Sequence, residues 1–212
     1  MRLRKKPWIA EALTAYSGKE LIEEKLIEKS GHWRAIVGKE RLSLEIGSGK
    51  GAFITGMAAL HPDEGFLGLE VQRDICYHGV KKIRELQLAN VKIIYGDGAH
   101  LAEWFAHGEV DCLYLNFSDP WPKARHAKRR LTYRSFLAVY KQILKPQGHL
   151  RFKTDNDDLF AFSLEEFKAF GVKILAVTND LHHSSYENEV ETEYEKRFSA
   201  LGKKINFCEI EF

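Results

Sequence analysis

The chain of 212 residues has only three cysteines, and their positions exclude two common uses of this residue. Cys76, Cys112 and Cys208 are odd in number, lie far apart and form no Cys-x-x-Cys pair. Neither a disulfide framework nor a structural zinc site is therefore expected. His182 and His183 also lack companions at metal-ligand spacing, so no metal site is predicted. We expect a reduced, cytoplasmic protein.

Long apolar runs are absent as well. The sequence has no apolar stretch of about 18 residues, and the amino-terminal MRLRKKPWIAEAL lacks the apolar run of about 7–15 residues that a signal peptide needs. Neither secretion nor a membrane location is expected. The length suits one α/β domain, and no internal repeat or low-complexity tract divides it.

Acidic residues are missing from one long stretch. Between Pro120 and Thr154 there is no Asp or Glu, whereas Lys and Arg contribute ten positive charges. The formal net charge is only +2, so the distribution of charge carries more information than the total. Asp119 stands directly before this stretch, at the end of an expected strand. The pattern predicts that a polyanion meets a carboxylate here.

Apolar runs of strand length alternate with helical patterns along most of the chain. Strands are expected at residues 41–46, 65–70, 91–98 including a turn, 110–117, 149–154, 172–178 and 203–209. Helices are expected at residues 19–29, 52–60, 73–89, 101–106, 132–144 and 157–170, with a turn at 145–148. This order predicts an α/β fold with a mostly parallel seven-stranded sheet, helices on both faces and a last antiparallel strand.

Residues 1–40 are expected to form a basic amino-terminal arm and a short helix ahead of the main domain at 41–212. Arg2, Arg4, Lys5 and Lys6 precede any acid. Two interpretations stay open for this arm, a solvated flexible terminus or a segment that lies on a phosphate backbone.

A glycine-rich turn follows the first expected strand. In LEIGSGKGAF, Gly47, Gly49 and Ala52 satisfy the GxGxxA form of the dinucleotide fingerprint. Such glycines permit a tight turn and a close approach of the backbone to a ligand. Glu70 ends the second expected strand, where it can accept hydrogen bonds from ribose hydroxyls. The motif fits both NAD and S-adenosylmethionine, since each carries a ribose.

Charges around this turn favour one of the two cofactors. Glu45 immediately precedes the glycines, and Asp97 lies in the turn after the third strand. An acid suits a ligand with an ammonium group and a sulfonium, whereas it repels a pyrophosphate. Charge therefore favours S-adenosylmethionine over NAD. A P-loop is excluded, because no Ser or Thr follows Lys50.

Several motifs together resemble a known family. They are LEIGSGKG, Glu70, the GDG turn, SDPWPKARHAKRRL, the KTD of the fifth strand and the late TEYEKRF, and they span residues 44–198. On these motifs the sequence resembles the bacterial tRNA (guanine-N7)-methyltransferases of the class I methyltransferase superfamily. The resemblance implies a Rossmann-like class I methyltransferase fold. It also implies methyl transfer from S-adenosylmethionine to the variable-loop guanosine of tRNA.

The resemblance assigns roles to individual positions, with Asp119 as the catalytic residue. The expected cofactor-binding residues include the two fingerprint glycines and are Glu45, Gly47, Gly49, Glu70, Asp97 and Asp119. The implied substrate-binding residues are Lys123, Asp155, Thr192, Glu193, Tyr194 and Glu195, and the implied RNA-contact residues are Arg125, His126, Lys128, Arg129 and Arg130. The sequence departs from the family at Ser48, Ser118 and Ala124, none of which removes a charged role.

The chemistry of guanine agrees with these acids. The attacked ring nitrogen has a lone pair and no proton to remove, so alignment of the reacting atoms matters more than proton transfer. Positive charge develops on the purine during transfer, and a carboxylate that accepts from its Watson–Crick N–H groups binds the transition state more tightly. Asp119 or Glu195 can do this. Trp121 either stacks on the unstacked base or packs under its own loop.

Three other functions stay open at this stage. A methyltransferase that acts on a different base would use a similar loop, and a cofactor-free RNA-binding module would use the basic residues alone. An NAD-dependent oxidoreductase is disfavoured by Glu45 and by the size of the basic cluster. The expected partner is tRNA, and the sequence also allows a homodimer.

Overall fold

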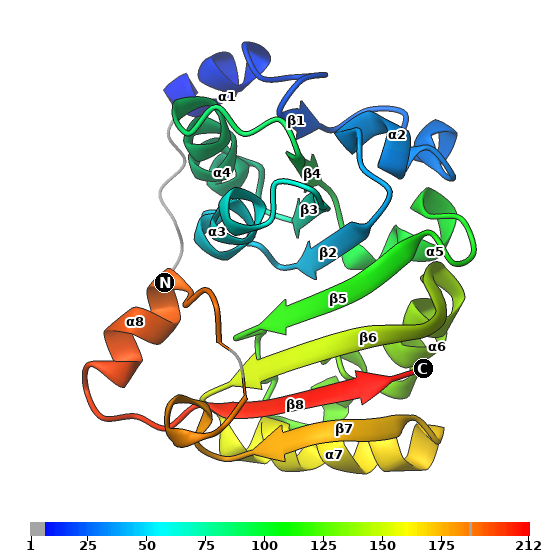
Figure 1. Cartoon of the computed structure of the whole chain (residues 1–212), viewed down its shortest axis with the longest axis vertical. Coiled ribbons are helices and arrows are strands. Elements are labelled where there is room, and N and C mark those ends of the chain that lie inside the picture. The colour runs from blue at the N-terminus through cyan, green and yellow to red at the C-terminus, as the bar shows by residue number, and fades with distance from the viewer. Residues whose placement is uncertain (1–6, 187) are drawn as a thin grey trace.

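The computed structural model describes residues 7–186 and 188–212, and one sheet runs through this part of the chain (Figure 1). Its strands are β1 (Leu21–Ile22), β2 (Leu42–Ile46), β3 (Gly65–Glu70), β4 (Val91–Tyr95), β5 (Val110–Asn116), β6 (Leu144–Thr154), β7 (Lys173–Thr178) and β8 (Asn206–Glu211). Their order in the sheet is β1-β4-β3-β2-β5-β6-β8-β7. All neighbours pair in parallel except β8, which is antiparallel to β6 and β7. The expected α/β sheet with a last antiparallel strand is confirmed.

Helices cover both faces of this sheet. They are α1 (Pro7–Thr14), α2 (Trp33–Val37), α3 (Ala52–Leu60), α4 (Arg73–Glu85), α5 (Leu101–Trp104), α6 (Arg134–Ile143), α7 (Asp157–Phe170) and α8 (Glu193–Ser199). Short 3-10 turns are η1 (Ile27–Lys29), η2 (Gly98–His100), η3 (Ala124–Arg129) and η4 (Leu181–His183). Among the described residues, no helix combines the length and the apolar character needed to pass through a bilayer.

The alternation of side chains along the strands decides which core each residue joins. Leu44 and Ile46 of β2 enter the core built with α2, α5, α6 and α7, and Phe66 of β3 enters the opposite core with α1, α3 and α4. Successive side chains of a strand point to opposite faces. Glu45 therefore points to the face that α3 covers.

The strand order reverses between β2 and β5, and this reversal positions the site. The chain runs from β2 to β3 and β4 on one side, and from β5 to β6 on the other. In open parallel sheets, ligands bind outside the carboxyl ends of the strands at such a point. Figure 1 shows α8 at this edge, beyond the arrowheads of β5 and β6.

The helix expected at residues 19–29 is wrong. Leu21 and Ile22 instead form β1 and pair with Ile93 and Ile94 of β4. Both side chains of β1 are buried, so pairing within the sheet overrides the local helical pattern. β1 is the strand that the expected set of seven did not include.

Part of the expected amino-terminal arm is a packed helix. Ile9 and Leu13 of α1 are buried in the core shared with α4. Trp8 meets Tyr77 edge to face, with ring centroids 5.2 Å apart. Residues 1–6, which carry the basic cluster, lie outside the described residues, so both interpretations of that cluster stay predictions. Residues 7–40 pack on the same sheet as the rest, and the division at 40/41 stays a proposal.

The turn expected at residues 145–148 lies inside β6. The register between β5 and β6 shifts at this point, and Gln147 has a φ of 61°. These extra residues bulge out while pairing continues on both sides. The sequence therefore predicts the turn-like backbone of residues 145–148. It does not predict that Leu144, directly before the turn, already pairs with Val110 of β5.

The three cysteines differ in exposure but share the direction of their pKa shift. Cys76 and Cys208 are buried and Cys112 is half-buried. Burial raises the pKa of each thiol to about 12. They are therefore protonated and unreactive near neutral pH.

Candidate active site

The glycine-rich turn joins β2 to α3 at the carboxyl edge of the sheet. Gly47, Gly49 and Gly51 have φ values of 79°, 54° and 74°, in the left-handed region that favours glycine. A Cβ at Gly51 would also lie only 2.9 Å from the Cα of Gly79 in α4. Glycine is therefore required at Gly51 both by the backbone conformation and by the close approach of α4.

Glu70, the last residue of β3, braces this turn. Its carboxylate accepts hydrogen bonds from the backbone N–H groups of Gly49 at 2.9 Å and Gln72 at 2.8 Å. Burial raises the pKa of Glu70 above its ordinary value, and the charge of Asp119 acts in the same direction. Glu70 and Asp119 therefore lie close enough to influence each other across the edge of the sheet.

Glu45 and Asn116 present unpaired acceptors to a cavity. Glu45 is only 2% exposed, and its Oε1 accepts from the Asn116 Nδ2 at 2.9 Å. Burial raises the pKa of Glu45 to about 7, against the effect of this hydrogen bond and of the Lys153 charge. Among the described residues, Glu45 Oε2, Asn116 Oδ1 and Ser48 Oγ have no hydrogen-bond partner.

The cavity that these atoms line has a volume of about 440 Å³, which suits a small-molecule ligand. Buried acceptors without a partner cost free energy unless a ligand donates to them. The glycine-rich turn from Gly47 to Gly49 lines the cavity as well. The site therefore suits a ligand that carries positive charge and donates hydrogen bonds.

A segment late in the chain, residues 188–199, lines the same cavity, and we call it the C-terminal wall. The wall residues that line the cavity are Thr192, Glu193, Tyr194 and Arg197. Thr192 Oγ1 accepts from the Glu195 N–H at 2.9 Å, and Glu195 Oε2 accepts from the Thr192 N–H at 3.3 Å. This capping box fixes the amino-terminal turn of α8.

Side chains distant in sequence tie the wall in place. Glu193 pairs with Lys82 of α4 at 2.6 Å, and this hydrogen bond lowers the pKa of Glu193. Tyr194 packs on Phe117, with ring centroids 4.9 Å apart, and its hydroxyl donates to Asp155 at 3.2 Å. The structure therefore brings the expected substrate residues Asp155 and 192–195 together beside the cavity.

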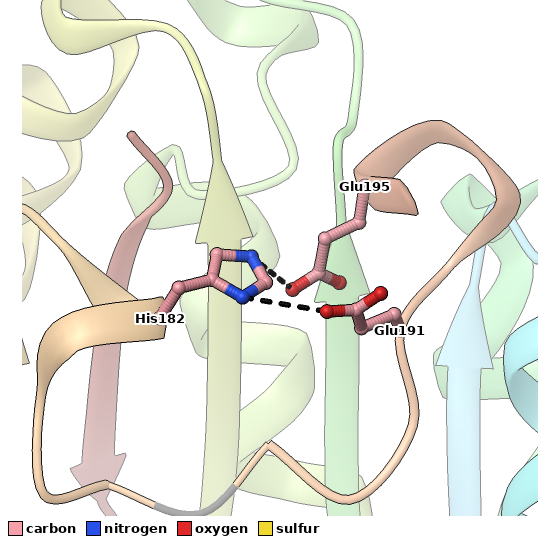
Figure 2. A group of neighbouring side chains, drawn as sticks. All are labelled: His182, Glu191 and Glu195. Atoms are coloured by element: carbon pink, nitrogen blue, oxygen red, sulfur yellow. Dashed lines mark ion pairs between the residues drawn. The ribbon is translucent and has the colours of Figure 1, made fainter. Parts of the chain in front are cut away.

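Glu195 is fully buried, and side chains from several elements hold it. Lys153 Nζ of β6 lies 2.9 Å from Oε2, and Asn188 Nδ2 donates to Oε1 at 2.8 Å. The His182 ring of η4 faces both Glu191 and Glu195, whose carboxylates lie on the same side of it (Figure 2). Its Nδ1 lies 3.3 Å from Glu191 Oε1 and its Nε2 3.3 Å from Glu195 Oε1. Glu195 is thus a buried charge surrounded by donors.

His182 therefore has neighbours in space that its sequence spacing did not reveal, while the expectation of no metal site stays a prediction. The ligand atoms of His182, Glu191 and Glu195 lie within 4.8 Å of one another, a group that can hold a metal ion. The two ring nitrogens, however, face different carboxylates, and Lys153 already neutralises Glu195. An imidazole beside two acids, whose Nε2 makes no hydrogen bond within the described residues, describes the group better than three donors aimed at one point.

Two acidic residues of the site are exposed, in contrast to the buried Glu45 and Glu195. Asp97 begins η2, is exposed, and accepts from the Ala99 N–H at 3.0 Å. Asp119 and Lys123 are exposed on the loop after β5. The backbone of this loop is strained, because Phe117 has a φ of 53° and Trp121 a φ of 41°. Such strain is concentrated at functional sites in proteins.

Trp121 packs within its own loop. The guanidinium of Arg129 lies 4.8 Å from the centre of the Trp121 ring, and His126 meets that ring edge to face at 5.7 Å. Arg125, Lys128 and Arg129 are exposed on this stretch. The contacts favour the packed interpretation of Trp121 and leave the basic residues at the surface.

Arg130 differs from the other basic residues of η3 and its flank. Its Nε donates to the Pro120 carbonyl and its Nη2 to the Trp121 carbonyl, both at 3.1 Å. Its guanidinium also lies over the Phe162 ring, 4.2 Å from the centre. Arg130 therefore holds the strained loop, whereas the sequence grouped it with the RNA-contact residues.

Two residues of the site were missed from the sequence. Asn116 ends the buried strand β5, and Lys153 lies near the end of β6 with only 5% exposure. A polar residue at the carboxyl end of a buried strand was the available signal for both. This signal does not identify the partner of either residue. Only the structure shows that Asn116 pairs with Glu45 and Lys153 with Glu195.

Comparison with protein families gives a match over most of the chain. A family model described as "Putative methyltransferase" matches residues 39–208. The tRNA (guanine-N(7)-)-methyltransferase of Streptococcus mutans serotype c (strain ATCC 700610 / UA159) is 50% identical over 186 residues, 87% of this chain and 88% of that protein. The protein of the same name from Geobacillus kaustophilus (strain HTA426) is 46% identical over 210 residues, 99% of this chain and 96% of that protein.

Solved structures show the same fold at lower identity. The 16S rRNA methyltransferase KamB has a TM-score of 0.64 and 10% identity, with 86% of this chain and 91% of that chain covered. An antibiotic-related methyltransferase has a TM-score of 0.62 and 20% identity, with coverages of 84% and 90%. A SAM-dependent methyltransferase from Aquifex aeolicus has a TM-score of 0.57, 14% identity and 82% coverage of both chains. These neighbours share the fold.

Proposed function

Because the chain belongs to the tRNA (guanine-N(7)-)-methyltransferase family, we propose that it transfers a methyl group from S-adenosylmethionine to N7 of a guanine in tRNA. The resemblance of its motifs extends this proposal to the guanosine of the variable loop. One observation carries it: a single cavity joins the unpaired acceptors of Glu45 and Asn116 to the wall residues beside the Asp119 loop.

The residues around the cavity fit S-adenosylmethionine. Glu45 Oε2 and Asn116 Oδ1 are acceptors for its ammonium group. Glu70 keeps lone pairs for the ribose hydroxyls beyond those used by Gly49 and Gln72. Bound there, the cofactor supplies a methyl group on a positively charged sulfur. The acids Glu45, Glu70 and Asp119 favour that charge over the anionic pyrophosphate of NAD.

We assign the base-edge contact to Asp119. Guanine N7 carries no proton, so the carboxylate serves as a hydrogen-bond acceptor rather than as a base. It accepts from the Watson–Crick N–H groups, which become stronger donors as positive charge develops on the purine. Asp119 is exposed, whereas Glu195 is buried and held by donors. These exposures support Asp119 over Glu195 for this contact.

Phosphate contacts are proposed for the exposed basic residues of the loop after β5. Lys123, Arg125, Lys128 and Arg129 all lie at its surface. Positive charges placed this way bind the RNA backbone without reading sequence. They would hold tRNA while an unstacked guanosine enters beside Asp119.

The proposal is tested by methyl transfer to unmodified tRNA. The protein is incubated with methyl-labelled S-adenosylmethionine and total tRNA, the RNA is digested, and the labelled nucleoside is identified. Label in 7-methylguanosine, lost in Asp119→Ala, is expected. Label in another nucleoside would replace the guanine assignment with a different base. Bound tRNA without any label would favour an RNA-binding module.

A further inference from the structure

Lys153 is a buried lysine whose donors are all used by one segment. Its Nζ lies 2.9 Å from Glu195 Oε2, 3.0 Å from Asn188 Oδ1 and 3.3 Å from the Val190 carbonyl. An ammonium has three donors, and here each one meets the C-terminal wall. A lysine that is only 5% exposed thus ties the end of β6 to residues far along the chain.

The same ammonium also lies near two residues that line the cofactor side of the cavity, Phe53 and Glu45. Nζ lies 5.1 Å from the centre of the Phe53 ring, and Phe53 lines the cavity. The charge of Lys153 lowers the pKa of Glu45, and burial lowers the pKa of Lys153 while Glu195 and Glu45 raise it. One buried cation therefore serves a buried acid of the glycine-rich turn and a buried acid of the wall.

We propose that Lys153 is a positioning residue: its ammonium holds the Glu195 carboxylate and, through the capping box, the amino-terminal turn of α8 against the cavity. The effect on turnover rests on the proposed function, whereas the effect on α8 does not. Thr192 and Tyr194 then keep their places as lining residues because Glu195 is anchored.

The charged groups that face Glu195 come from two elements besides its own helix. Lys153 approaches from β6 at 2.9 Å, and His182 approaches from η4 at 3.3 Å. His182 also faces Glu191 through its other nitrogen. Asn188 and the Thr192 N–H complete the surroundings as neutral donors. Without Lys153, the buried Glu195 carboxylate would keep neutral donors and one neighbouring imidazole but no hydrogen-bonded cation, which is costly for a buried charge.

The first test compares Lys153→Met with the unchanged protein. Methionine keeps a similar length without the ammonium, and kcat for tRNA methylation is expected to fall roughly 10²-fold, as small misplacements near reacting groups do. Amide hydrogen exchange of the peptide covering residues 188–199 is expected to become faster. Lys173→Met, on the far edge strand β7 with its lysine exposed, is the matched control and should change neither quantity.

A double-variant cycle separates positioning from a general loss of structure. If Lys153 acts through Glu195, then Lys153→Met/Glu195→Gln should have the same kcat as Glu195→Gln alone, since paired sites are not additive. Losses that multiply would overturn the proposal. In the double variant Glu195 is no longer an uncompensated charge, so this variant also provides the comparison if Lys153→Met alone does not fold.

Rescue by a conservative variant gives a readout that a merely structural role would not move. Lys153→Arg keeps a positive charge near the Glu195 carboxylate, so its kcat should exceed that of Lys153→Met. In the Glu195→Gln background, Lys153→Arg and Lys153→Met should have the same kcat. An equal ratio of the two kcat values in both backgrounds would contradict the proposal.

The outcomes also separate this inference from the proposed function. If the unchanged protein methylates no tRNA but Lys153→Met still speeds exchange in residues 188–199, the proposed function fails and the positioning role stands. If methylation is normal and Lys153→Met alters neither exchange nor kcat, the positioning role fails alone.

Discussion

The glycine-rich turn and the C-terminal wall line the same cavity, yet different kinds of bonds build them. Around the turn, Glu70 accepts from two backbone N–H groups, and the glycines meet the backbone of α4 and β3. Around the wall, Lys82, Lys153 and Asp155 bind it through side chains. The turn is shaped by backbone geometry, and the wall is held by charge.

This difference has a physical consequence. Backbone hydrogen bonds and left-handed glycines leave few alternative conformations, so the turn is preformed for its ligand. Exposed ion pairs such as Glu193 with Lys82 contribute little and are screened by salt. The buried pair of Lys153 and Glu195 is costly to break by removing one partner. The wall therefore depends mainly on one buried pair.

The largest effect is expected at Asp119, an exposed residue that belongs to neither the turn nor the wall. Asp119→Ala should lower kcat for tRNA methylation by about 10³-fold, because it removes an acceptor that matters most in the transition state. Affinity for S-adenosylmethionine, measured by calorimetry, should change by less than about threefold. Asp119→Asn keeps one acceptor oxygen and should lose less. Loss of cofactor binding instead would assign Asp119 to the cofactor side.

A second prediction concerns the turn. Glu45→Gln should weaken S-adenosylmethionine binding by about 30- to 100-fold, since a hydrogen bond to a charged partner contributes about 2–3 kcal/mol. Glu193→Gln is the control, because Glu193 lines the same cavity but is half-exposed and paired with Lys82. Its effect should stay below about fivefold. Equal losses of affinity in both variants would show that the turn and the wall contribute alike to cofactor binding.

The pH dependence of cofactor binding should follow Glu45. Its pKa is about 7 in the free protein, so the carboxyl is mostly protonated at pH 6 and mostly ionised at pH 8. A cationic ligand needs the ionised form, so affinity should rise about tenfold between these values, as expected for one linked proton. Calorimetry at each pH checks this. Glu45→Gln should remove the slope, and a slope that persists would point to another group.

The smallest expected effects distinguish Arg125 from Arg130 in the basic stretch. Arg125→Ala should weaken tRNA binding by about fivefold and reduce the slope of log affinity against log salt by about 1. Arg130→Ala should leave that slope unchanged and lower kcat by about fivefold, because Arg130 holds the carbonyls of Pro120 and Trp121. Filter binding at several salt concentrations gives the slopes. A reduced slope in Arg130→Ala would show that Arg130 contacts phosphate.

The turn could be predicted from the sequence because its signals are local. Gly47 and Gly49 directly follow a buried strand, and Glu70 ends the next one, so a parallel sheet brings them to one edge. The periodicity of the strands predicted the sheet for the same reason. The helix predicted at residues 19–29 is wrong because Leu21 and Ile22 pair with β4 and are buried there. The spacing of apolar residues within this segment does not reveal a partner strand that lies far along the chain.

The bonds of the wall could not be predicted, because their partners are far apart in the chain. TEYEKRF predicts an exposed amphipathic segment from its charges alone, yet Glu195 is fully buried while Glu193 is exposed. Burial of Glu195 follows from Lys153, which precedes it by 42 residues. The resemblance marked both acids as substrate residues, and only the structure separates an anchored acid from an open one.

The shielded thiols give this protein a practical property for spectroscopy. Because burial keeps Cys76, Cys112 and Cys208 protonated, maleimide dyes should leave them largely unmodified under native conditions. A cysteine introduced at Arg197, an exposed residue of α8 that lines the cavity, would then be labelled selectively. The emission of such a dye would report ligand binding in the cavity without any background substitution in the native cysteines.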